Sequence, residues 1–260
     1  MSTAPYHPVV FGPYKSRRFG QSLGINLAPS PREDCPKDCV YCEGPDSSGP
    51  IINRISQAPS AGVIVTSAAR RIIEMSKGGD KLAGITISGN NEPTMHAALL
   101  EITDNLRALR NKWYPKAKLS ILSNHPCLET PDLVHALEIY DQPVVRFEWG
   151  SAKTFTAMTK RPGTELKELI EFLSGLERLV VQASFVQGGP ENSTDKEVKS
   201  WIRKISEIAP TEIQVLTIPD PGRGKKPRPV TDAKLKTIAT QVHEATEIPT
   251  TAYSAAGKLA

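Results

Sequence analysis

The stretch Cys35-Pro36-Lys37-Asp38-Cys39-Val40-Tyr41-Cys42 decides how the rest of this 260-residue chain is interpreted. Its three cysteines follow a C-x3-C-x2-C spacing, with an aromatic residue, Tyr41, directly before the third. Pro36 disfavours regular helix or strand, so the segment is predicted to be a loop. Such short separations let one loop direct three sulfurs at a single metal centre, and cysteine thiolates are the usual ligands of iron–sulfur clusters. Three protein ligands would leave one metal position open to a substrate.

The same cysteines also suit a structural zinc loop, in which Cys127 or a histidine would complete four ligands. The protein would then be a zinc-bound binding module without enzymatic activity. The cysteine spacing alone leaves both alternatives open, whereas the polar residues after the predicted strands favour the cluster.

Composition limits the class of protein. Apolar residues make up 39% and charged residues 23% of the chain, which is typical of a globular protein. No apolar run approaches the roughly 18 residues that a membrane span needs, and residues 1–8 contain no signal-peptide segment. Four cysteines, three of them clustered, do not resemble a disulfide framework, so we expect a reducing, cytoplasmic location. The net charge of +4 is too small to establish an anionic partner.

Short apolar strands alternate with helical patterns along the chain. We predict strands at 23–27, 85–88, 119–122, 144–149, 179–186 and 213–218, with helices between them. Ser60 is predicted to cap the first helix, Thr130 with Pro131 to open the third, and Thr194 with Glu197 to form a capping box. Six βα units predict a parallel sheet, either doubly wound or closed into a barrel. We expect one domain over 1–260, with a core at 11–253 and a tail at 254–260.

Polar residues follow the predicted strands where α/β barrels place their chemistry. Strand two ends in the run 88–94, which contains Asn90 and Glu92, and strand three in 123–127, which contains Ser123, Asn124 and Cys127. Strand four ends at Glu148, and Arg161 follows. Ordinary turns would also explain the polar runs, an ion pair would explain a buried Glu148, and Arg161 can be an exposed loop cation.

The cysteine loop resembles the signature of the radical S-adenosylmethionine (radical SAM) superfamily. This resemblance implies a partial (β/α)6 TIM-like barrel and a 4Fe-4S cluster held by Cys35, Cys39 and Cys42. SAM would chelate the fourth iron, and Tyr41 would lie near its adenine. The implied reaction is reductive cleavage of SAM to a 5′-deoxyadenosyl radical, which abstracts a hydrogen atom from a substrate.

The other motifs are similar to those of the branch of this superfamily that makes the tRNA base wyosine. Gly-Asn-x-Glu-Pro-Thr at 89–94 matches that branch, with Asn91 in place of a glycine, and the Ser-Asn pair at 123–124 and the Arg-Pro pair at 161–162 match as well. The resemblance implies that SAM or the substrate is bound by six residues: Asn90, Glu92, Ser123, Asn124, Glu148 and Arg161. It spans about 11–253.

The substrate leaves little trace in the sequence. The wyosine enzymes take a second cluster from three further cysteines, and this chain has none before Cys35, which counts against that full reaction. We therefore expect a small-molecule or nucleoside substrate. The alternative is an RNA- or protein-modifying enzyme, such as a wyosine-like tRNA-modifying enzyme or a glycyl-radical activase, with the basic run at 223–228 as a docking surface. An ordinary solvated loop is the other interpretation of this run.

Two further expectations concern Cys127 and the electron donor. Cys127 is the one cysteine outside the loop, and it would donate a hydrogen atom or hold a second group if it lies near the site; a buried packing role is the alternative. An electron donor such as flavodoxin or ferredoxin is expected to reduce the cluster, and no membrane is involved.

Overall fold

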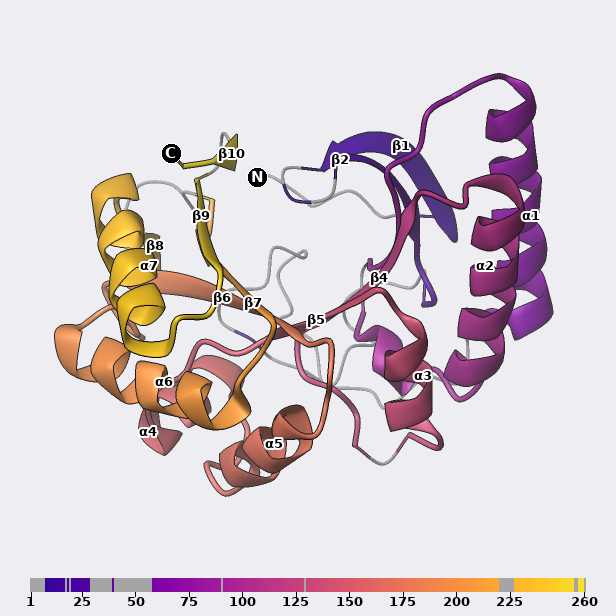
Figure 1. Ribbon diagram of the computed structural model, residues 1–260. Helices are drawn as coiled ribbons and strands as arrows, with labels where there is room; N and C mark the ends of the chain where they lie inside the picture. Colours follow the sequence, from indigo (N-terminus) through magenta and orange to yellow (C-terminus); the bar gives the residue numbers. More distant parts are fainter. Residues whose placement is uncertain are drawn as a thin grey trace. The chain divides into compact units, whose positions relative to one another are not determined.

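The computed structural model describes residues 8–16, 18, 20–28, 39, 58–89, 91–128, 130–219, 227–254 and 257–259 (Figure 1). The chain divides into two compact units, one made of Met1–Pro36 with Glu43–Val144 and the other of Lys37–Cys42 with Val145–Ala260. The single domain expected over residues 1–260 stays a prediction beside this division. Among the described helices, none has the length and apolar composition needed to cross a membrane.

The first unit is a sheet with helices along one side. Its elements are β1 (Val10–Ser16), β2 (Gly20–Ile25), α1 (Ala61–Lys77), β3 (Gly84–Ile87), the 3-10 turn η3 (Pro93–Met95), α2 (Leu99–Trp113), β4 (Lys118–Ser123), α3 (Leu133–Ile139) and β5 (Gln142–Arg146), whose last two residues belong to the second unit. β1 pairs antiparallel with β2, while β2, β3 and β4 run parallel in that order. α1 and α2 lie side by side (Figure 1).

The two faces of this sheet differ in chemistry. Alternate residues of β2, β3 and β4 are fully buried and apolar: Leu23, Ile25, Ile85, Ile87, Leu119 and Ile121. The residues between them on β3 and β4 include Thr86 and Ser120, which are buried and face each other in the register. Because side chains alternate along a strand, the opposite face is polar. A sheet with helices on one side only needs a single continuous apolar face.

An ion pair fixes the start of β4. The Arg110 guanidinium on α2 bonds to the carboxylate of Asp141 and, at 2.8 Å, to the Ala117 carbonyl. Asp141 also accepts from the Leu119 N–H at 2.8 Å. Burial would raise the pKa of Asp141, but the hydrogen bonds from Leu119 and Arg110 and the positive charges of Arg110 and Lys118 outweigh it, so the pKa lies below its usual value of 3.8.

The second unit repeats the α/β pattern. Its elements are α4 (Ala152–Thr159), α5 (Glu165–Ser174), β6 (Val180–Gln187), α6 (Asp195–Ile208), β7 (Glu212–Thr217), β8 (Arg228–Pro229), α7 (Asp232–Thr246), β9 (Thr250–Ser254) and β10 (Gly257–Lys258). β6, β7 and β9 run parallel in that order, β10 pairs antiparallel with β9, and β8 pairs antiparallel with the end of β6.

The apolar face of this unit carries the helices. Phe185 on β6 meets Trp201 of α6 edge to face, with ring centroids 5.0 Å apart. The other face includes the buried polar residues Gln182, Ser184 and Gln214, and Gln182 Nε2 donates to Gln214 Oε1 across the two strands at 3.2 Å. Buried polar side chains therefore lie on the strands of both units.

Two expectations about the elements are wrong, and a third is confirmed in part. Thr130 and Pro131 do not open a helix: α3 begins at Leu133, and the Thr130 hydroxyl instead donates to the Thr94 carbonyl. Strand four ends at Arg146 rather than 149. The capping box is half formed, because Thr194 Oγ1 accepts from the Glu197 N–H at 3.3 Å whereas the Glu197 carboxylate accepts from Ser151.

Candidate functional site

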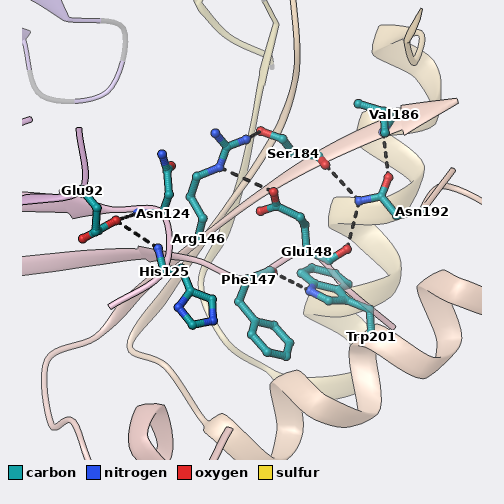
Figure 2. Close-up of polar contacts among 10 residues, drawn as sticks. All are labelled: Glu92, Asn124, His125, Arg146, Phe147, Glu148, Ser184, Val186, Asn192 and Trp201. Atoms are coloured by element: carbon teal, nitrogen blue, oxygen red, sulfur yellow. Dashed lines mark hydrogen bonds and ion pairs between the residues drawn. The ribbon is translucent and has the colours of Figure 1, made fainter. Parts of the chain in front are cut away.

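Glu92 is the centre of a buried hydrogen-bond network in the first unit. Its Oε1 accepts from the Thr94 N–H at 3.2 Å, the Thr94 hydroxyl at 2.7 Å and the Ser123 hydroxyl at 2.7 Å. Its Oε2 accepts from the N–H groups of Asn124 at 2.9 Å and His125 at 3.1 Å. Figure 2 shows the last two contacts. The structure therefore brings three predicted site residues, Glu92, Ser123 and Asn124, together at the ends of β3 and β4.

These contacts give Glu92 a definite role in the fold. A carboxylate has about four acceptor positions, and five donors already converge on this one. The side chain is 4% exposed, so its charge is compensated by the loops that follow the two strands. Glu92 therefore sets the conformation of both loops. The role predicted for Glu92 in binding SAM or the substrate stays a prediction.

The loop between β3 and Glu92 is fixed to the residues that follow β2. A β-carbon on Gly89 would lie 2.5 Å from Asn26 Cγ, so only glycine allows this approach, and its φ of +156° is also unusual for other residues. Asn91 donates from Nδ2 to the Ala28 carbonyl at 3.1 Å. Asn91 is not among the non-glycine residues with positive φ in the described chain, so it needs no left-handed backbone where the related run has glycine. Asn90 lies outside the described residues.

Cys127 belongs to the same network through its backbone. Its N–H donates to Thr94 Oγ1 at 2.9 Å, and that hydroxyl in turn donates to Glu92. Cys127 is half-buried. Sequence reasoning placed Cys127 near the predicted site residues of strands two and three, and the hydrogen bonds connect it to them. A catalytic role for the thiol stays a prediction.

Glu148 in the second unit is fully buried and has a cationic neighbour. Arg146 Nε lies 3.6 Å from Glu148 Oε1, and Arg146 Nη2 donates to Ser184 Oγ at 2.6 Å (Figure 2). This is the ion pair that the sequence left open as an alternative for Glu148. Arg146 was missed, although residues i and i+2 of an extended chain share a face, which is a signal that could have found it.

Hydrogen bonds from side chains fix the backbone around Glu148, which lies beyond the end of β5. Asn192 Nδ2 donates to the carbonyls of Glu148 at 2.9 Å and Ser184 at 3.0 Å, and its Oδ1 accepts from the Val186 N–H at 2.8 Å. Trp201 Nε1 donates to the Phe147 carbonyl at 2.9 Å (Figure 2). Buried carbonyls need such partners. Asn192 was also missed by sequence reasoning.

Arg161 is paired within its own loop and helix. Its guanidinium bonds to the Glu165 carboxylate on the first turn of α5, and its N–H donates to Thr159 Oγ1 at 3.2 Å. The side chain is 30% exposed. This ion pair agrees with the alternative interpretation of Arg161 as a loop cation, here paired with a neighbouring acid. The role predicted for Arg161 in binding SAM or the substrate stays a prediction.

The predicted cluster ligands are described in part. Cys39 is buried, with 5% of its surface exposed, and its role as a cluster ligand stays a prediction. Cys35, Cys42 and Tyr41 lie outside the described residues. Within the described residues, no three His, Cys, Asp or Glu side chains could hold a metal ion together. His96 does not suit the zinc alternative, because its ring nitrogens contact the Pro59 carbonyl at 3.0 Å and the Ala98 N–H at 3.1 Å.

Comparison with known sequences gives distant relatives over most of the chain. No protein-family model matches. A UPF0026 protein of Helicobacter pylori strain J99 is 27% identical over 237 residues, which cover 88% of this chain and 72% of that protein. A UPF0026 protein of Synechocystis is 26% identical over 269 residues, covering 93% of this chain and 95% of the relative.

Comparison with solved structures gives the fold class. Streptococcus suis SuiB, crystallised with its precursor peptide SuiA, matches 89% of this chain with a TM-score of 0.62 at 15% identity. A second crystal structure of SuiB gives a TM-score of 0.59 at 16% identity. The chain spans about half of SuiB's length, 48% and 49% in the two structures. The fold is the α/β fold of the radical SAM TIM-like type, which confirms the predicted class.

Proposed function

We propose that this protein is a radical SAM enzyme. The observation that carries the proposal is a C-x3-C-x2-C motif, with an aromatic residue before its third cysteine, on a chain with a radical SAM TIM-like fold. Cys35, Cys39 and Cys42 would hold a 4Fe-4S cluster with SAM at its fourth iron. When bound, the two cofactors supply reductive cleavage of the sulfonium and a 5′-deoxyadenosyl radical that takes a hydrogen atom from the substrate.

The residues of the first unit would act by positioning. Glu92 fixes the loops after β3 and β4 through its five hydrogen bonds, and those loops carry Asn90 and Asn124, the proposed SAM contacts. Ser123 is part of the same network through its hydroxyl. Because a preformed polar site needs no reorganisation when it binds a ligand, such a network supports cofactor binding at these strand ends.

The residues of the second unit would supply a buried charged pair. Glu148 is the proposed acceptor for the ribose hydroxyls of SAM, and Arg146 balances its charge inside the protein. Asn192 holds the Glu148 carbonyl, so the side chain projects from a fixed backbone. Arg161 would bind an anionic group only after releasing Glu165.

The proposed substrate is a small molecule or a nucleoside, and an electron donor such as flavodoxin or ferredoxin would reduce the cluster. A second candidate is modification of a peptide or an RNA. The peptide version is favoured by the likeness to SuiB, whose crystal structure contains a precursor peptide. The resemblance to the wyosine branch supports an RNA version. The basic run 223–228 would bind the RNA; its residues 223–226 lie outside the described part of the chain, whereas Arg228 is described.

The test is anaerobic reconstitution with iron, sulfide, SAM and dithionite, followed by chromatography of the nucleoside products. We expect 5′-deoxyadenosine from the wild-type chain and none from Cys39→Ala. Cys127→Ala is the matched control, because it removes a thiol outside the motif and should leave cleavage of SAM intact. Equal 5′-deoxyadenosine from wild type and Cys39→Ala would refute the proposal. Deuterium transfer from labelled peptides, nucleosides or RNA then identifies the substrate class.

A further inference from the structure

Arg228 lies beside the carboxyl end of β6, although it follows β7 in the chain. The short strand β8 brings it there, with Arg228 in register with Gln187. Two hydrogen bonds fix this return of the chain: Gln187 Nε2 donates to the Pro229 carbonyl at 2.8 Å, and the Val230 N–H donates to Thr217 Oγ1 at 3.0 Å. The backbone of Arg228 is therefore held in place while the residue as a whole is exposed.

The guanidinium of Arg228 packs against a glycine. A β-carbon on Gly188 would lie 3.3 Å from Arg228 Nε and 3.6 Å from Nη2. Gly188 and the next residue, Gly189, both have positive φ, +86° and +84°, which glycine adopts without steric cost. A β-carbon on Gly189 would meet no atom within 4 Å. The guanidinium thus packs against the α-carbon of Gly188, and the α-carbon of the neighbouring Gly189 faces open space.

Arg228 also has no acidic partner within the described part of the chain. The ion pairs formed there by arginines involve Arg71, Arg107, Arg110, Arg146 and Arg161. A guanidinium carries its charge at all relevant pH values and offers a planar set of five N–H donors, which matches a carboxylate or a phosphate. The carboxyl ends of parallel strands are where α/β folds bind their ligands.

We propose that Arg228 binds an anionic group of the substrate, a carboxylate or a phosphate, and that Gly188 positions its guanidinium for this contact. The inference rests on the proposed function, which supplies the substrate at the strand ends. Arg228 takes part in binding only, and no bond is made or broken at this residue. Its role is to select substrates that carry the anion.

The test follows the Nε–Hε resonance of Arg228 in the full-length, nitrogen-15-labelled chain, assigned by its absence from Arg228→Gln. Inorganic phosphate and succinate are titrated separately. A saturable shift with either probe supports the proposal and identifies the anion class. Shifts that stay linear with both probes and match those of the exposed Arg203 would overturn it. The titration uses neither iron nor SAM, so its failure is distinguishable from failure of the proposed function.

A matched pair of glycine variants tests the positioning. Both replacements strain a positive φ, but only Gly188→Ala places a methyl group against Arg228. We expect the dissociation constant for the probe to rise about tenfold in Gly188→Ala, because the displaced guanidinium loses a charge-assisted contact with the probe. In Gly189→Ala the dissociation constant should stay within about twofold of the wild-type value. Equal effects in the two variants would overturn the positioning role. If Gly188→Ala does not fold, Arg228→Lys replaces it, with weaker binding expected because the planar fork is lost.

Discussion

Replacing Glu92 tests whether this carboxylate holds the site loops together. Glu92→Ala removes the acceptor for three buried main-chain donors, the N–H groups of Thr94, Asn124 and His125. Each unsatisfied buried donor costs about 1–3 kcal/mol. Allowing for water that enters the vacated space, we expect the free energy of unfolding to fall by roughly 3–6 kcal/mol.

Glu92→Gln should be milder, for a reason visible in the geometry. The amide nitrogen would face the Oε1 side, where the hydroxyls of Thr94 and Ser123 can rotate to accept, whereas the Oε2 side has two fixed N–H donors. Only the Thr94 N–H would then lack an acceptor, so we expect a loss of about 1–3 kcal/mol.

The assay is urea unfolding of the metal-free chain, followed by circular dichroism, with the exposed Glu244→Gln as a control expected to change stability by less than about 0.5 kcal/mol. Because metal and SAM are absent, the measurement isolates the role of Glu92 in the fold. If Glu92→Ala unfolds at the same urea concentration as the wild type, the carboxylate does not position the loops.

Three further predictions concern the packing around the site. The pKa of Asp141 is lowered in the folded chain, so its stabilising effect is present above the unfolded value of 3.8 and is lost as pH falls through the lower folded value. The stability advantage of wild type over Asp141→Asn should therefore shrink from pH 5 towards pH 2, and a constant difference would contradict this. In Asn192→Asp, a carboxylate replaces the amide that donates to two carbonyls. The free energy of unfolding, measured by thermal unfolding, should therefore fall by about 3 kcal/mol, more than for Asn192→Ala. Gly150→Ala would place a β-carbon 2.2 Å from a main-chain oxygen of α6, so the free energy of unfolding should fall by about 2 kcal/mol or more. In Gly62→Ala the new β-carbon in α1 meets only an atom at 4.0 Å, so the free energy of unfolding should rise by about 0.5–1 kcal/mol. A change of the same sign in both variants would refute the packing argument.

Hydrophobic patterning predicted the regular part of the fold well. The helix from Ser60 to Lys77 forms with the expected cap, since Ser60 accepts from the Val63 N–H. The strands at 85–88, 119–122, 179–186 and 213–218 coincide with β3, β4, β6 and β7 within a few residues. Buried parallel strands and amphipathic helices leave strong local signals, and these elements have them.

The elements that were missed depend on contacts between distant residues. β1 (Val10–Ser16) contains a proline and has an irregular register, and it is a strand because β2 pairs with it: Phe11 lies against Gly24, where no β-carbon would fit. β9 (Thr250–Ser254) forms because Gln214 and its neighbours in β7 supply the parallel partner. A short polar strand has no pattern of its own until its partner is placed.

The same limit applies to the site. The sequence selected Glu92, Ser123 and Asn124 from their positions after strands, and hydrogen bonds join all three. It could not show that five donors satisfy Glu92, because those donors come from two loops 30 residues apart. Asn192 was missed because it bonds to main-chain groups, which leave no sequence signal.

The central claim is that the cysteine motif holds an iron–sulfur cluster, and metal analysis of protein reconstituted without oxygen tests it most directly. We predict about four iron and four sulfide ions per chain for the wild type and for Cys127→Ala, and little of either for Cys39→Ala. Zinc in place of iron, or equal iron in Cys39→Ala and wild type, would contradict the account.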